Sequence, residues 1–210
     1  MRAENEDAIC DGGDVLNAPR HLFVVLSERI NFSAVEVLAN AFDVETVSVP
    51  FDNSNALHLT SIVCHMDSNT LLAPTGVVGD QALEAMRYNE LGYDAIRLPN
   101  MLACNVVAVN GGILAQDGGC QESKALLLSG AAERGLSMHF VDGSEIDKVD
   151  GALTCCSVLL MVVCACDHVY CALLEIVVTG GDVRLERRTC IDVKVRVGSD
   201  SKVIVKYSDW

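Results

Sequence analysis

The chain has 210 residues, of which 50% are hydrophobic and 5% aromatic, and its formal net charge is −14 at pH 7. This length suits one domain or two small ones, and the apolar content is sufficient for a packed core. The acidic balance, without a Lys/Arg stripe, argues against nucleic-acid binding and favours a soluble protein acting on a small, cationic molecule.

The ten cysteines do not predict a disulfide framework. Residues 1–7 are charged and contain no apolar segment, so we expect no signal peptide and a cytoplasmic protein with reduced, mostly core thiols. The longest apolar stretch, 152–165, is followed by Asp167 and His168. It is shorter than the roughly 20 residues of a spanning helix, so we expect no membrane insertion.

The first 160 residues predict a repeat of about 45 residues, in which each module has the order strand, strand, helix, strand. Ser33 is the expected N-cap of the first helix and Gly135 the expected end of the third. The helices are expected at 33–42, 80–89 and 122–134. The strands are expected at 23–26, 44–49, 57–63, 70–73, 95–98, 105–109, 112–115 and 137–141.

Three similar modules predict repeats packed around an axis, with a doubly wound βαβ sheet as the alternative. The pattern changes after residue 160. Residues 182–207 alternate valine with charged side chains, which predicts an amphipathic strand with Val193, Val195 and Val197 on one face. We therefore expect a domain at 1–160 and an extension at 161–210 that does not continue the repeat.

Two features of the first module suggest chemistry. Asp11 and Asp14 flank two glycines, which allow the backbone to come close to a ligand or an imidazole; the alternative is an ordinary surface turn. Arg29 follows an apolar strand and can hold a carboxylate with two parallel hydrogen bonds. Its alternative is an exposed arginine paired with Glu28.

The later modules contain an imidazole and a thiol. His58 lies in the expected strand 57–63, where the alternative is a hydrogen-bonded core histidine. Cys155 and Cys156 are adjacent, and disulfide geometry disfavours a bridge between them, so a reactive thiol and a buried reduced thiol both stay open. Together with Asp11 and Arg29, these groups suit attack by a thiolate on an electrophilic carbon, with the histidine moving protons.

Five ordered segments show a resemblance to a known family. They are 11–16 (DGGDVL), 26–31 (LSERIN), 57–61 (LHLTS), 103–105 (ACN) and 144–158 (SEIDKVDGALTCCSV). Over about residues 9–160 the chain resembles dimethylarginine dimethylaminohydrolase, in the guanidino-group-modifying (pentein) superfamily. The resemblance implies an α+β fold, an α/β-propeller of five ββαβ units. This chain would supply the last three as an incomplete ring, followed by an unmatched, β-like tail at 161–210.

The resemblance also implies an activity: hydrolysis of Nω-methylated arginine to citrulline and methylamine or dimethylamine, with no metal and no organic cofactor. Cys155 would be the nucleophile that forms a covalent intermediate, and Cys156 its non-catalytic neighbour. His58 would protonate the departing amine and activate water, and Asp11 would orient His58. Arg29 would bind the substrate carboxylate, and the backbone of Val149 would contact the substrate.

Two departures from the family leave alternatives open. The family's first two units, which carry guanidinium-binding carboxylates, have no counterpart here, so we expect impaired activity. An inactive or partner-binding fragment that self-associates through open propeller edges is one alternative. A related hydrolase acting on free arginine, as in the arginine deiminases, is the other.

Overall fold

The computed structural model describes residues 7–42, 44–51, 58–148, 151–163, 169–176, 194–197 and 203–206. Residue 149 lies outside this range, so the predicted Val149 contact is not described. The chain divides into two compact units, Met1–Cys155 and Cys156–Trp210. Each unit is considered by itself below.

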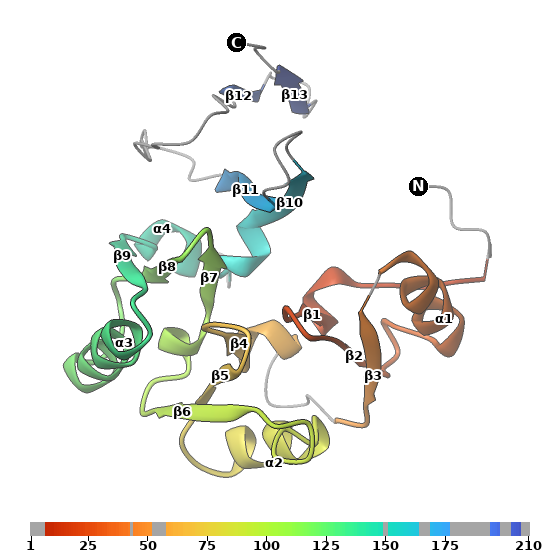
Figure 1. Cartoon of the computed structure of the whole chain (residues 1–210), viewed down its shortest axis with the longest axis horizontal. Helices are drawn as coiled ribbons and strands as arrows, with labels where there is room; N and C mark the ends of the chain where they lie inside the picture. Colours follow the sequence, from red (N-terminus) through yellow and green to blue (C-terminus); the bar gives the residue numbers. More distant parts are fainter. Residues whose placement is uncertain are drawn as a thin grey trace. The chain divides into compact units, whose positions relative to one another are not determined.

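The first unit consists of three modules with the same plan, as predicted (Figure 1). In each module a short 3-10 turn precedes two strands, a helix and a third strand. The first has η1 (Gly12–Asp14), β1 (Val15–Asn17), β2 (His21–Val25), α1 (Phe32–Ala41) and β3 (Glu45–Val49). The second has η2 (Leu59–Ser61), β4 (Cys64–His65), β5 (Thr70–Pro74), α2 (Val77–Ala85) and β6 (Asp94–Leu98). The third has η3 (Leu102–Cys104), β7 (Val106–Val109), β8 (Gly112–Gln116), α3 (Gln121–Glu133) and β9 (Ser137–Val141).

Each module forms its own three-stranded sheet, with its second strand in the centre. The central strand pairs antiparallel with the first strand and parallel with the third, so the helix makes the crossover between parallel neighbours. Figure 1 shows the first strands on the inner side of this unit and the helices on its outside. Three separate sheets rule out the alternative of one doubly wound sheet in the first unit.

The hydrophobic core lies mainly between neighbouring modules. One cluster joins the first module to the second and includes Phe23, Val47 and Leu83; another joins the second to the third and includes Leu72 and Ile113. A module therefore cannot bury its apolar face alone, which is the physical basis of a repeat architecture.

Helix ends follow local side-chain chemistry. The N-cap of α1 is Asn31, whose side chain accepts a hydrogen bond from the N–H of Ala34 at 3.0 Å, and not the predicted Ser33. Gly135 ends α3 as predicted: its φ of 66° allows Leu136 N–H to donate to Ala131. The helix predicted at 80–89 begins three residues earlier and ends at Ala85. Met86 still packs in the core from the turn that follows.

The strand predicted at 57–63 is wrong. Among its described residues, 58–63, the backbone makes the turn η2 and enters β4 only at Cys64. The reason is local bonding to the first module: Leu59 N–H donates to the Asp14 carboxylate and Thr60 Oγ1 donates to the Gly13 carbonyl, both at 3.1 Å. These bonds hold residues 59 and 60 in the turn in place of hydrogen bonds to a neighbouring strand.

Two further elements follow β9 in the chain, α4 (Ser144–Asp147) and η4 (Thr154–Cys156). The second unit has β10 (Ser157–Val163) paired antiparallel with β11 (Val169–Ile176), and β12 (Lys194–Val197) paired antiparallel with β13 (Val203–Lys206). The alternating segment 182–207 thus contains strands, as predicted. The face expected for its valines concerns side chains outside the described residues.

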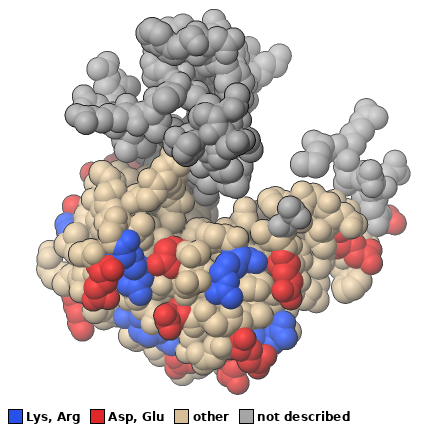
Figure 2. Space-filling view, in the orientation of Figure 1, with Lys and Arg blue, Asp and Glu red and all other residues tan. Residues whose placement is uncertain are grey.

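Charged side chains of both signs are interspersed on the face drawn in Figure 2. Close ion pairs join Arg97 to Asp80 at 2.7 Å and Lys124 to Asp117 at 2.9 Å. In the part of the chain that the structure describes, no helix is both long enough and apolar enough to cross a membrane.

Candidate active site

The 3-10 turns place the candidate residues at related positions of the repeat. Asp11 is the N-cap of η1, His58 the N-cap of η2, Asn105 the C-cap of η3, and Cys155 lies in η4. Each turn immediately precedes or leads into the first strand of a sheet. Periodicity in the sequence indicated the strands but not these turns, which carry the polar groups.

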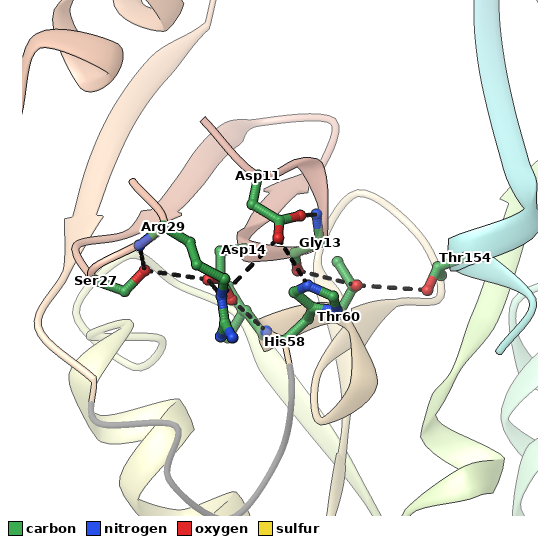
Figure 3. Close-up of polar contacts among 9 residues, drawn as sticks. Asp11, Gly13, Asp14, Ser27, Arg29, His58, Thr60 and Thr154 are labelled. Atoms are coloured by element: carbon green, nitrogen blue, oxygen red, sulfur yellow. Dashed lines mark hydrogen bonds and ion pairs between the residues drawn. The ribbon is translucent and has the colours of Figure 1, made fainter. Parts of the chain in front are cut away.

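Asp11 and His58 form a hydrogen-bonded pair between the first two modules (Figure 3). His58 Nε2 lies 3.1 Å from Asp11 Oδ2. The pKa of Asp11 is lowered, first by the hydrogen bond from Gly13 N–H and then by His58 and Arg29. An ionised carboxylate only accepts hydrogen bonds, so His58 Nε2 carries the proton that joins the pair. Nδ1 is buried and has no hydrogen-bond partner among the described residues.

Gly13 makes this pairing sterically feasible. A Cβ atom built on Gly13 would lie 2.3 Å from Cγ of His58, far inside van der Waals contact. The imidazole therefore occupies the space where any other residue would have its side chain. At neighbouring Gly12 the same construction meets no atom within 4 Å. Close approach, expected at the glycine pair, is required at Gly13.

Asp14 is the second carboxylate of the Asp-Gly-Gly-Asp segment, and its place in the site is not evident from the sequence. Its side chain is fully buried. It accepts hydrogen bonds from Leu59 N–H at 3.1 Å, Arg29 Nε at 3.2 Å and Ser27 Oγ at 3.3 Å. A buried carboxylate needs such donors to offset its desolvation, and these tie the Arg29 loop and the His58 turn together.

Arg29 lies next to the Asp11–His58 pair. Its Nε is 4.0 Å from Asp11 Oδ2, and its backbone N–H donates to Ser27 Oγ at 3.1 Å. The loop that carries it is closed by reciprocal backbone hydrogen bonds between Ser27 and Ile30. The guanidinium is thus held at a defined place near the imidazole (Figure 3), and the alternative of a loose surface pair with Glu28 is not what the structure has.

The cysteine turn is joined to the His58 turn by a buried polar connection. Thr154 Oγ1 lies 3.4 Å from Thr60 Oγ1 and 2.7 Å from Asn105 Nδ2, and Thr154 N–H donates to Asn105 Oδ1 at 3.1 Å. Asn105 Nδ2 also donates to the Thr60 carbonyl at 2.8 Å. The segment 103–105 is part of the family resemblance, but no periodicity or charge pattern distinguishes Asn105 within it.

The described cysteines fall into two groups. Cys64 and Cys104 are buried, as expected for core thiols, and burial raises the pKa of Cys64 to about 12. Cys155 is exposed, as are Cys10 and Cys120. The reactive-thiol hypothesis requires access to solvent, and Cys155 meets that requirement. The Cys156 side chain is outside the described residues.

Within the described ranges, no group of three or more His, Cys, Asp or Glu side chains is arranged to hold a metal ion. Asp11, His58 and Arg29 form one arrangement of hydrogen bonds and ion pairs, and the exposed Cys155 follows Thr154, which is hydrogen-bonded to the His58 turn. These groups are of the kinds needed for nucleophilic catalysis by a thiol.

Known proteins resemble this chain both in sequence and in fold. No protein-family model matches the chain. It is 28% identical over 158 residues to the N(G),N(G)-dimethylarginine dimethylaminohydrolase of Streptomyces coelicolor, covering 74% of this chain and 56% of that one. The chain therefore spans little more than half the length of this curated relative.

Two solved structures share the fold. Dimethylarginine dimethylaminohydrolase from Pseudomonas aeruginosa, with citrulline bound, has a TM-score of 0.57 at 19% identity, over 71% of this chain and 55% of that one. The N-terminal domain of an arginine dihydrolase from cyanobacteria has a TM-score of 0.54 at 22% identity, over 72% and 56%.

The repeated ββαβ modules and these similarities show that the first unit has the pentein fold, which dimethylarginine dimethylaminohydrolases share with amidinotransferases. In sequence the chain is similar to part of a dimethylarginine dimethylaminohydrolase, in line with the resemblance of its sequence segments.

Proposed function

We propose that this chain carries the thiol half of a hydrolase for Nω-methylated arginines. The observation that supports this most is the Asp11–His58 hydrogen bond of 3.1 Å, connected through Thr60 and Thr154 to the turn of the exposed Cys155. A base and an orienting carboxylate linked to an accessible thiol are the parts that covalent catalysis by cysteine needs.

In the proposed reaction the Cys155 thiolate attacks the guanidinium carbon of asymmetric dimethylarginine. The tetrahedral adduct collapses as His58 protonates the departing nitrogen, which releases dimethylamine and leaves a thiouronium group on Cys155. His58 then takes a proton from water, the resulting hydroxide attacks the same carbon, and the C–S bond breaks. Citrulline leaves and the thiolate is restored, so the net reaction consumes one water.

The remaining residues have supporting roles in this proposal. Asp11 orients His58 through their hydrogen bond, and Arg29 binds the substrate carboxylate. Asp14 holds Arg29 Nε at 3.2 Å and Leu59 N–H at 3.1 Å, so it fixes the carboxylate-binding group relative to the imidazole. The Val149 backbone contact implied by the family resemblance stays a prediction.

The test measures citrulline and dimethylamine released from asymmetric dimethylarginine by the full chain and by Cys155→Ala. We expect release by the parent chain and none by the variant, because no other group replaces the nucleophile. Cys120→Ala is the matched control, since Cys120 is also exposed but lies at the start of α3. Equal rates for the parent and Cys155→Ala would exclude Cys155 from the mechanism.

A second candidate substrate is free arginine, favoured by the structural similarity to the cyanobacterial arginine dihydrolase. The same chemistry would then release ammonia instead of dimethylamine. Supplying both substrates in parallel and measuring kcat/KM for each decides between them.

A further inference from the structure

Asn105 occupies an unusual place for a polar side chain. It is 1% exposed, and it is the C-cap of η3. All the same, both ends of its amide are engaged. Nδ2 donates to the Thr60 carbonyl at 2.8 Å and to Thr154 Oγ1 at 2.7 Å, and Oδ1 accepts from Thr154 N–H at 3.1 Å.

The partners of this amide belong to two different turns. Thr60 comes two residues after His58 in η2, and Thr154 immediately precedes Cys155 in η4. The remaining contact between the two threonines, Oγ1 to Oγ1, is longer at 3.4 Å. Asn105 therefore provides the short bonds that join the imidazole's turn to the thiol's turn, while Thr60 Oγ1 continues the connection to Gly13, beside Asp11, at 3.1 Å.

We propose that Asn105 is a positioning residue that sets the Cys155 turn at its working distance from His58. This inference rests on the proposed function, because it presupposes that Cys155 and His58 act together. Its amide suits the task since one rigid, planar group supplies two donors and an acceptor. A carboxylate in its place would meet the Thr60 carbonyl with a like partial charge, and an alanine would leave Thr154 N–H and the Thr60 carbonyl unpaired.

A positioning role and a purely structural role for Asn105 predict different outcomes for the influence of His58 on the reactivity of the Cys155 thiol. If Asn105 only stabilises the third module, its loss lowers stability and leaves the influence of His58 on Cys155 intact in the folded molecules. If it positions the turn, that influence disappears even in folded protein. Misplacement of a reacting group by about 1 Å can cost about 100-fold in rate.

The experiment measures alkylation of Cys155 by iodoacetamide at neutral pH, with the modified peptide quantified by mass spectrometry because Cys10 and Cys120 are also exposed. His58→Ala is introduced into the parent chain and into the variants Asn105→Ala, Thr154→Val and Thr154→Ser. Thr154→Val removes only the hydroxyl, and Thr154→Ser keeps it. Ile113→Val, a buried change in β8 of the same module, is the control for stability alone.

In the parent chain, Thr154→Ser and Ile113→Val, we expect His58→Ala to slow alkylation by about threefold or more. In Asn105→Ala, the added His58→Ala change should have no effect on the rate of alkylation. In Thr154→Val its effect should be smaller than in the parent chain. Where turnover is measurable, Asn105→Ala should lower kcat by about 10–100-fold with KM within about threefold, since the carboxylate-binding Arg29 is untouched.

Undiminished coupling in both Asn105→Ala and Thr154→Val would overturn the inference. If His58→Ala has no effect in the parent chain, the proposed Cys155–His58 pair fails and the inference fails with it. If the coupling is present and Asn105-dependent but no citrulline is released, the positioning role stands and the proposed hydrolysis is refuted.

Discussion

At the scale of single residues, the candidate site depends on how closely the imidazole approaches the backbone of another module. The His58 ring lies where a Gly13 side chain would be, and its Nε2 reaches Asp11 at 3.1 Å. The sequence motif showed two glycines between two aspartates, without indicating which glycine is indispensable. The two glycines differ in the structure, because Gly13 faces the ring and Gly12 does not.

Gly13→Ala should displace His58 and break its bond to Asp11, since the added methyl would lie 2.3 Å from Cγ of the ring. We expect a loss of about 1–3 kcal/mol in the free energy of unfolding and at least about a 100-fold fall in citrulline release. Gly12→Ala is the matched control, with no atom within 4 Å of its new methyl. Similar activity in the two variants would contradict the close packing of His58 on Gly13.

At the scale of elements, the positions of the helices and strands were largely predictable, and the residue that caps α1 was not. Apolar spacing indicated α1 and α3 to within a residue at most ends, because burial of one helix face imposes a period. Caps depend on which side chain points back to the free N–H groups. Asn31 accepts from Ala34 N–H at 3.0 Å and from Ile9 N–H at 3.1 Å, and it donates to the Asp7 carbonyl at 2.7 Å.

Asn31→Ala should therefore lower the free energy of unfolding by about 1–2 kcal/mol, because α1 loses its cap and the segment at Asp7–Ile9 loses its anchor. Ser33→Ala should change it by less than about 0.5 kcal/mol, because Ser33 lies inside the first turn of α1 and is not the cap. Urea unfolding followed by circular dichroism measures both. An equal loss in the two variants would favour the capping role predicted for Ser33.

At the scale of the whole molecule, stability comes from apolar contacts between modules together with a few buried polar groups. His65, in β4, has a buried Nδ1 without a hydrogen-bond partner among the described residues. Burial lowers the pKa of His65 from 6.5 to about 4, with Asp67 acting weakly in the opposite direction. Burial also lowers the pKa of His21, so both histidines fold as neutral groups.

A lowered histidine pKa means that the unfolded chain binds a proton more readily than the folded one. The contribution of His65 to stability is thus constant above pH 6.5 and decreases as the pH falls toward about 4. Each pKa unit corresponds to about 1.4 kcal/mol, so His65 should account for about 2–3 kcal/mol of the loss between pH 7 and about pH 4.5.

His65→Gln should reduce the loss of stability over that range by the same amount, and His21 should account for part of what remains. The lowered pKa of Asp11 affects stability in a different pH range. Below its ordinary pKa of 3.8, protonation of the carboxylate removes the hydrogen bonds that stabilise the folded chain. Unfolding midpoints measured at both pH values provide the comparison. An unchanged pH dependence in His65→Gln would show that His65 is not buried in its neutral form.

Exposed apolar side chains bear on assembly at this scale. Phe32 is 64% exposed and Val77 70% exposed. The self-association expected through open propeller edges stays a prediction, to be measured by sedimentation of the full chain.

The sequence by itself determined the repeat and the order of strands and helices in each module, and its resemblance to dimethylarginine dimethylaminohydrolase gave the candidate residues Asp11, Arg29, His58 and Cys155. The repeat follows from periodic burial and the candidate residues from short ordered segments, and both are local properties of a chain. Only the tertiary structure decided that His58 sits on a turn and not in a strand, that Gly13 makes room for it, and that Asp14 and Asn105 join the turns. The physical reason is that these relations are hydrogen bonds and contacts between modules, and their partners lie too far apart in sequence for any local pattern to reveal them.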